Sequence, residues 1–125
     1  MAKSILIIDD DKLILMTLKR VLKREGYNVI TALNGQTALR RIEEDNFDLI
    51  ISDIKMPNMD GIETVKKIRE FLARHHKTPI PELFITGYAK EDVYQKALEL
   101  HTAGYIEKPF DLKELLTNIE KNIER

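Results

Sequence analysis

The 125-residue sequence contains no cysteine. Disulfide bonds, thiolate metal sites and cysteine nucleophiles are therefore excluded, and the absence suits a protein of the cytosol. No apolar run approaches the length that spans a bilayer, and residues 1–4 lead directly into a strand-like run rather than a signal peptide. We therefore expect a cytoplasmic protein that does not associate with the membrane.

The sequence also has no large excess of positively or negatively charged residues. The formal net charge is -1 and no long basic run occurs, so no positive field is available to hold nucleic acid. A glycine-rich phosphate-binding loop is absent as well, which argues against a nucleoside triphosphate as the direct ligand. We expect no direct contact with nucleic acid.

The length and composition predict one globular domain over residues 1–125. Apolar residues make up 43% of the chain and charged residues 33%, a mixture that fills a core and keeps the surface solvated. A chain of this size holds one hydrophobic core of ordinary dimensions.

Five short apolar runs predict five β-strands. They cover residues 5–8, 29–33, 49–51, 83–85 and 105–106. The first and third runs show no polar alternation, which is typical of strands covered on both faces and favours a parallel sheet. The run at 29–33 has no charged residue at its end and is expected at the sheet edge.

Amphipathic patterns between these runs predict helices. The last helix is the clearest, with apolar residues at helical spacing after an N-cap at Asp111: Leu112, Leu115, Leu116, Ile119 and Ile123. The first carries Ile14, Leu18, Val21 and Leu22 on one side and ends before Gly26. Asn34-Gly35 and Asp60-Gly61 open the second and third, and the fourth lies around 89–100. Strict alternation predicts a doubly wound α/β fold with right-handed crossovers.

Polar residues follow four of the predicted strands. Asp9-Asp10-Asp11 follow the first, Asp53 the third, Thr86 the fourth and Lys108 the fifth. The carboxyl ends of parallel strands meet at one edge of the sheet, where ligands bind. Three carboxylates brought together there, from Asp9, Asp10 and Asp53, predict a hard divalent cation, and Mg²⁺ fits better than zinc because no thiolate is present.

A lysine and a hydroxyl beside such a cation form a site for phosphoryl chemistry. Asp53 is the candidate nucleophile because it ends the central strand. Lys108 and Thr86 are placed to neutralise and to bind the transferred group. The phosphoryl group is expected to come from another protein or a small phosphodonor.

Each of these residues also has an ordinary structural role open to it. The acids at 9–11 can cap the following helix, and Asp11 is expected to do only that. Asp53 can belong to a turn, Thr86 to a strand and Lys108 to the solvated surface. Their joint placement at one edge favours the phosphoacceptor site. We expect surface positions for His75, His76 and His101, packing beneath the loop for Met56 and Met59, and a place for Asp48 at the opposite end of the sheet.

The ordered set of motifs resembles the receiver domain of the two-component response-regulator family. The matching residues span nearly the whole chain: Asp9-Asp10, the string from Asp53 to Gly61 (DIKMPNMDG), Thr86, Tyr105, and Lys108-Pro109-Phe110. The resemblance implies a flavodoxin-like three-layer sandwich with strand order 2-1-3-4-5. It also implies a signalling phosphoacceptor that assists its own phosphorylation and dephosphorylation rather than an enzyme with a separate substrate.

The resemblance further implies a role for each matching residue. A phosphohistidine of a sensor histidine kinase or a histidine phosphotransfer protein would donate to Asp53. Mg²⁺ would be bound by Asp10, Asp53 and the backbone carbonyl of Lys55, with Asp9 acting through water. Lys108 would contact the phosphoryl group. A cis peptide bond between Lys108 and Pro109 would aim the lysine into the site. Thr86 and Tyr105 would form the switch that signals to a downstream target protein.

Some positions depart from the pattern or vary within it. Residues 75–82 form a longer connection than usual and place a charge at the mouth of the fourth strand. Lys55 and Tyr88 should tune how readily water reaches the acyl phosphate.

A Mg²⁺-dependent hydrolase with an aspartate nucleophile is the alternative, but it requires an acid where Lys55 stands. A receiver fold used only as a docking surface is disfavoured because the phosphorylation set is complete. The chain could act through a partner, in a phosphorelay, or as part of a larger regulator.

Overall fold

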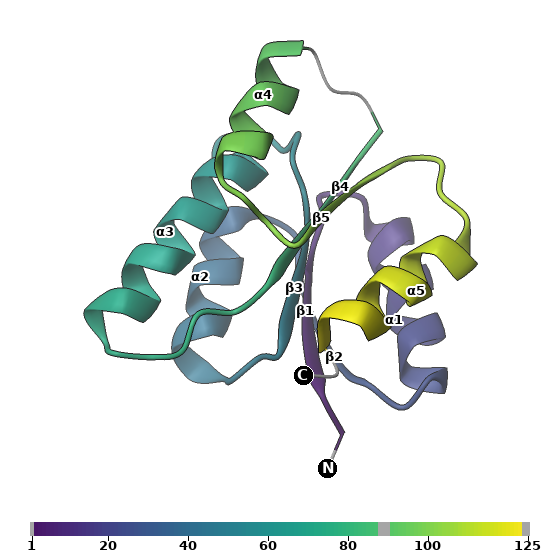
Figure 1. The fold of residues 1–125 in the computed structure, drawn as a ribbon. Coiled ribbons are helices and arrows are strands. Elements are labelled where there is room, and N and C mark those ends of the chain that lie inside the picture. Colours follow the sequence, from purple (N-terminus) through teal and green to yellow (C-terminus); the bar gives the residue numbers. More distant parts are fainter. Residues whose placement is uncertain (1, 88–90, 124–125) are drawn as a thin grey trace.

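The computed structural model describes residues 2–87 and 91–123, over which strands and helices alternate (Figure 1). The strands are β1 (Ser4–Ile8), β2 (Asn28–Ala32), β3 (Leu49–Asp53), β4 (Glu82–Thr86) and β5 (Gly104–Glu107). The helices are α1 (Lys12–Arg24), α2 (Gly35–Glu44), α3 (Gly61–Arg74), α4 (Glu91–Glu99) and α5 (Leu112–Ile123). Within the described part of the chain, no helix has both the length and the apolar character needed to cross a bilayer.

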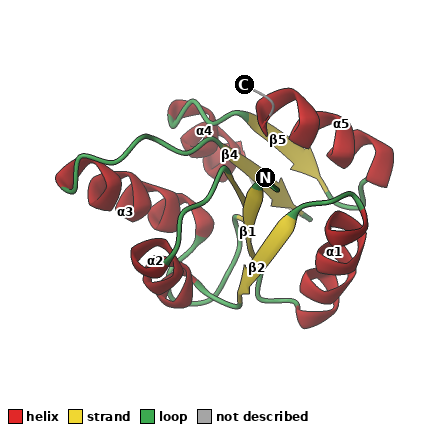
Figure 2. Ribbon diagram, turned by 90° about the horizontal axis from the view of Figure 1, so that it is seen from below, coloured by secondary structure: helices red, strands yellow, loops and turns green. Residues whose placement is uncertain are grey.

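The strands form one parallel sheet in the order β2-β1-β3-β4-β5, which confirms the predicted flavodoxin-like topology and the edge position of β2. Helices α1 and α5 cover one face, whereas α2, α3 and α4 cover the other (Figures 1 and 2). The chain reverses its direction of winding between β1 and β3. Doubly wound sheets bind ligands at the carboxyl ends of the two strands that flank this point.

Side chains alternate between the two faces of the sheet and divide the core into layers. On β1, Ile5 and Ile7 pack under α1 and α5, while Leu6 and Ile8 pack under α2 and α3. All four are fully buried, as expected for a strand covered on both faces. A third cluster around Phe84 lies beneath α3 and α4.

Local signals in the sequence mark the starts of α1, α2, α3 and α5 and the end of α1. The side chains of Asp11, Asn34 and Asp60 accept hydrogen bonds from backbone amides in the first turns of α1, α2 and α3. Asp111 does the same for Lys113 at the start of α5. Gly26 follows α1 with a φ of 94°, a left-handed conformation that suits glycine.

The structure shifts some predicted boundaries by one or two residues. β2 ends at Ala32, which pairs with the last residue of β1, so Leu33 lies beyond the ladder and is 40% exposed. On α1, Leu18 and Leu22 are buried as predicted and Leu15 is buried with them, whereas Ile14 is only partly buried. α4 runs from Glu91 to Glu99, and the start predicted at residues 89 and 90 lies outside the described part.

The charge at the start of β4 has a partner that the sequence did not reveal. Glu82 is 4% exposed, and its two carboxylate oxygens accept hydrogen bonds from Nε and a terminal nitrogen of Arg69 at 2.9 and 2.7 Å. Arg69 lies on α3, thirteen residues earlier. A buried charge requires such a partner, since an unpaired carboxylate has a large desolvation cost.

Candidate functional site

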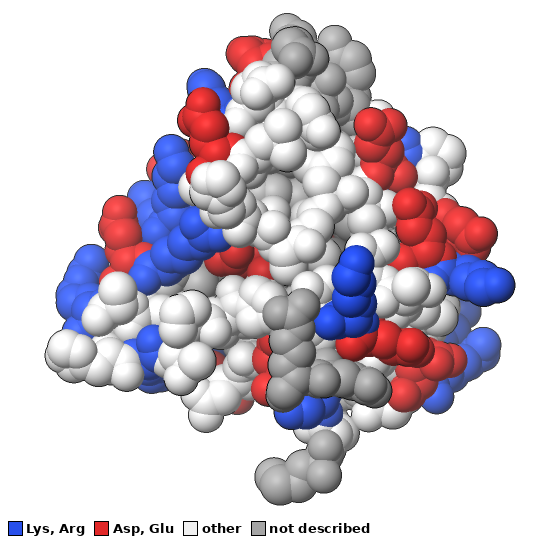
Figure 3. Space-filling view, in the orientation of Figure 1, with Lys and Arg blue, Asp and Glu red and all other residues white. Residues whose placement is uncertain are grey.

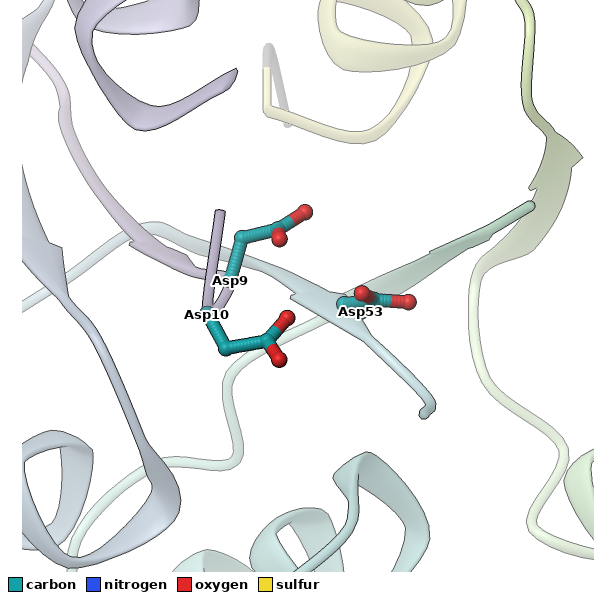
Figure 4. Close-up of side chains that lie close together, drawn as sticks. All are labelled: Asp9, Asp10 and Asp53. Atoms are coloured by element: carbon teal, nitrogen blue, oxygen red, sulfur yellow. The ribbon is translucent and has the colours of Figure 1, made fainter. Parts of the chain in front are cut away.

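The carboxyl ends of β1 and β3 bring three acids together. Asp9 and Asp10 directly follow β1, and Asp53 is the last residue of the adjacent strand β3. One carboxylate oxygen from each lies within 4.8 Å of the others. Figure 4 shows the three side chains close together, with the Asp10 carboxylate extending toward Asp53. The three carboxylates predicted to converge do so.

Asp9 is the most deeply placed of the three, with 0% exposure. One of its oxygens accepts from the backbone amide of Asp11 at 2.9 Å, and the other accepts from Nζ of Lys108 at 2.9 Å. Asp10, in contrast, is exposed. Asp9 is therefore fixed within the protein, whereas the Asp10 carboxylate is open to solvent and to an ion.

Lys108 directly follows the edge strand β5 and reaches the acids past the end of β4. Its backbone amide donates to the carbonyl of Thr86 at 2.7 Å, and the peptide bond to Pro109 is cis. Nζ also lies 3.4 Å from Oδ2 of Asp53, a longer contact than that to Asp9. Burial lowers the pKa of Lys108, but the hydrogen bond to Asp9 and the charges of Asp53 and Asp9 outweigh it, so the pKa lies above its ordinary value.

Asp53 is a buried carboxylate, 6% exposed. Burial raises its pKa and the charge of Asp9 raises it further, while Lys108 and the backbone of Ile54 lower it in part. The net pKa is raised, so the environment disfavours the charged form. The site holds more negative charge than one lysine neutralises.

The donor set fits a hard divalent cation. Among the described residues, Oδ1 of Asp53 is buried and has no hydrogen-bond partner, although buried carboxylate oxygens are normally satisfied. Carboxylate oxygens from three residues lie within reach of one ion. Oxygen ligands of this kind are those that Mg²⁺ prefers. The residues could therefore hold such an ion between Asp10 and Asp53, with Asp9 behind them.

Thr86 and Tyr105 lie on the other side of the sheet from the Lys108–Asp9 pair. Thr86 ends β4 and is 1% exposed. Tyr105, on β5, is partly buried against the cluster that contains Phe84. Its ring meets that of Tyr94 on α4 edge-on, with centroids 5.0 Å apart. Tyr105 therefore faces α4, and Thr86, two residues after Phe84 on β4, lies on the same face of the sheet.

The loop after β3 reveals one functional residue whose role the sequence did not explain. Gly61 begins α3, and its amide donates to the carbonyl of Ile54 at 2.7 Å. A β-carbon at Gly61 would collide with the backbone carbonyl of Asp53. Glycine at this position lets the start of α3 lie against the acceptor residue. In the sequence, Gly61 was marked as a helix start after Asp60 and as the end of the string that resembles the receiver family, but neither signal indicated its closeness to Asp53.

This arrangement agrees with a sequence match to a known family. The sequence profile described as the response regulator receiver domain matches residues 5–120. The chain belongs to this family. The matched region contains every residue of the acidic site and all of the sheet except Ser4, the first residue of β1.

Relatives of this receiver domain include regulators of transcription. The chain is 37% identical over its full length to the alkaline phosphatase synthesis transcriptional regulatory protein PhoP of Bacillus subtilis, and it spans about half (50%) of that relative. A CheY-like receiver domain protein of Methanospirillum hungatei has 33% identity and a TM-score of 0.89, with 99% of this chain and 95% of the other covered.

A third relative is a protein with bound ligands. It is a response regulator of Burkholderia pseudomallei described with a phosphorylated aspartic acid, a calcium ion and citrate. It has 27% identity and a TM-score of 0.82, and the match covers 98% of this chain and 69% of that protein.

Several other residues of the receiver domain lie where they were predicted. Asp11 caps α1, and Asp48 accepts a hydrogen bond from the amide of Ser4 at the opposite end of the sheet. Met56 and Met59 are buried under the loop. His75, His76 and His101 are exposed. Lys55 has an exposed side chain, and Tyr88 lies outside the described residues.

Proposed function

We propose that residues 1–125 form a single receiver domain that accepts a phosphoryl group on Asp53 in a Mg²⁺-dependent reaction and then signals to a partner protein. The donor is the phosphohistidine of a sensor histidine kinase or of a histidine phosphotransfer protein. The observation that supports this proposal most directly is the convergence of Asp9, Asp10, Asp53 and Lys108 at one edge of the sheet. The reaction takes place in the cytoplasm.

The proposed chemistry is a transfer between two side chains. A carboxylate oxygen of Asp53 attacks phosphorus, a new O–P bond forms, and the N–P bond to the donor imidazole breaks with its electron pair returning to nitrogen. The product is an acyl phosphate, which later loses its phosphoryl group to water. The domain supplies the acceptor and the charged groups around it, so it assists its own phosphorylation and dephosphorylation without a separate substrate.

Charge neutralisation is what the surrounding residues provide. A bound Mg²⁺, held by Asp10, Asp53 and the carbonyl of Lys55 with Asp9 acting through water, would neutralise the acids and the phosphoryl oxygens. Lys108 lies 3.4 Å from Asp53 and can move from Asp9 to the incoming phosphoryl group. The bound calcium ion and phosphorylated aspartic acid of the Burkholderia relative support this proposal for the present chain.

The switch rests on the two residues on the α4 side. Phosphorylation adds nearly two negative charges and three strong hydrogen-bond acceptors beside the end of β4. The hydroxyl of Thr86 can donate to them, and Tyr105 would then turn inward from its contact with Tyr94. A differential contact of this kind is required to shift the balance of two conformations.

The Mg²⁺-dependent hydrolase is not favoured. Its mechanism requires a proton-donating acid two residues after the nucleophile, and Lys55 stands there with an exposed side chain. The family match also points to signalling domains rather than hydrolases. Direct nucleic-acid binding stays outside the proposal, because the net charge is -1.

Intact-mass measurement after incubation with Mg²⁺ and acetyl phosphate tests the acceptor. The wild type should gain the mass of one phosphoryl group, and Asp53→Asn should gain none. Asp48→Asn is the matched control, because Asp48 lies just before the other end of β3 and should leave the adduct unchanged. An adduct that forms at an equal level in Asp53→Asn would remove Asp53 as the acceptor.

A further inference from the structure

A hollow of about 550 Å³ lies at the end of the sheet opposite the acidic site. It is an open hollow bordered by the end of α3, the segment 77–82 that leads into β4, and residues 100–103 after α4. The sequence singled out this segment as unusually long, and phosphorylation of Asp53 makes no use of it.

The walls of the hollow are mainly apolar. They are formed by Leu72, Ala73, Pro79, Ile80, Pro81 and Leu100. Small-molecule sites usually measure about 300–1,000 Å³ and combine apolar walls with a few polar groups. The volume and the lining therefore match a site for a small ligand with an apolar body.

The charged groups of the hollow favour an anion over a cation. Among the described residues, Glu82 is the only acid that lines it, and both carboxylate oxygens of Glu82 accept hydrogen bonds from Arg69 in a buried position. The cationic side chains of Lys77 and Arg69, in contrast, reach solvent. Lys77 is exposed, and the side chain of Arg69 is 38% exposed. Lys77 also lies with Nζ 5.6 Å from the ring centroid of Phe71, at the rim.

The same residues argue against a peptide or protein partner. Pro79 and Pro81 have no amide hydrogen, so this wall offers few of the backbone donors that an added strand requires. A stable protein interface buries about 800 Å² on each partner, far more than the mouth of such a hollow supplies. Figure 3 shows basic side chains gathered along α3, which would attract a small anion to this side of the molecule.

We propose that this hollow binds a small amphiphilic anion, with an apolar body against Leu72, Ile80 and Leu100 and a carboxylate at the cationic rim formed by Lys77 and Arg69. The site lies at the amino end of β4, away from the acidic site at the carboxyl ends of β1 and β3.

A headgroup series on the wild-type chain tests the chemistry of the ligand. Octanoate, 1-octanol and octyltrimethylammonium share one chain and differ in charge. They are titrated below their micelle concentrations into ¹⁵N-labelled protein without Mg²⁺, and amide shifts are followed by NMR. Octanoate should shift the amides of Leu72, Leu100 and Ala103 saturably and bind about two- to fivefold more tightly than 1-octanol. Equal binding of all three, or shifts scattered over the surface, would overturn the proposal.

A charge-reversal pair tests the position of the site. Lys77→Glu should weaken octanoate binding about two- to fivefold or more. Lys23→Glu makes the same change in net charge on α1, on the other face of the sheet, and should leave binding unchanged. The spectrum of each free variant reports whether it is folded. If both variants bind octanoate equally, the rim does not recognise the carboxylate and the proposal is wrong.

Discussion

Asp53 is a carboxylate whose surroundings disfavour its charge. Its pKa is raised by burial first and by Asp9 second. An acid with a raised folded-state pKa stabilises the fold below its ordinary value, here 3.8, and this contribution is lost as the pH rises through the folded-state pKa. In metal-free solution at neutral pH, the ionised Asp53 is therefore expected to destabilise the domain.

Replacing this charge should stabilise the metal-free protein. We predict that Asp53→Asn raises the free energy of unfolding by on the order of 1 kcal/mol at pH 7 in EDTA, with a gain that shrinks as the pH is lowered toward 3.8. Urea unfolding at several pH values measures it. Asp48→Asn should show no such gain. A loss of stability in Asp53→Asn, or a gain that grows on acidification, would contradict this electrostatic account.

The start of α3 requires glycine at position 61, a residue without a β-carbon. Alanine is normally preferred to glycine in a helix, but a β-carbon at Gly61 meets the carbonyl of Asp53. We predict that Gly61→Ala lowers the free energy of unfolding by about 2 kcal/mol, as overpacking does. At Gly87 the added carbon finds only ordinary contacts, 3.7 Å from Lys108, so Gly87→Ala should change stability by about 0.5 kcal/mol or less. Equal effects, measured by urea unfolding, would show that the close approach is unimportant.

In the ion pair between Arg69 on α3 and Glu82 on β4, the glutamate is buried and the arginine is partly exposed. We predict that Arg69→Met destabilises by about 2–3 kcal/mol because it leaves Glu82 buried without a partner. The double variant Arg69→Met/Glu82→Leu should recover most of this loss, since it removes both charges. Thermal and urea unfolding of the single and double variants check this. A double variant less stable than Arg69→Met would contradict it.

The elements were predictable where the signals are local. Apolar runs located the strands, and Asp11, Asn34 and Asp60 marked helix starts, because capping depends on residues only two or three positions apart. The convergence of the site residues followed from parallel topology alone. These features need no knowledge of side-chain packing.

The features that escaped prediction are contacts between residues of different elements, which no local pattern in the sequence marks. The pairing of Lys108 mainly with Asp9 depends on side-chain paths across the sheet. Glu82 was visible as a charge, but Arg69 had no signal that marked it as the partner. Likewise, the closeness of Gly61 to Asp53 depends on how α3 is placed against the end of β3.

The domain as a whole should be stabilised by the ion that its site fits. A ligand that binds only the folded state adds about 1.4 kcal/mol for each tenfold increase in concentration above its dissociation constant. We predict that Mg²⁺ raises the urea midpoint of the wild type in this way and that Asp10→Asn weakens the effect. Asp11→Asn is the matched control, because asparagine also caps helices and Asp11 serves only α1. A Mg²⁺ effect that is equal in both variants would place the ion elsewhere.

Locating the phosphoryl group on the chain tests the account most directly. After reaction with Mg²⁺ and acetyl phosphate, borohydride reduces an aspartyl phosphate to homoserine, which peptide mass spectrometry assigns to a position. The account predicts homoserine at residue 53, formed only when both Mg²⁺ and the phosphodonor are present. Homoserine at another aspartate, or a stable phosphate on a histidine, would contradict it.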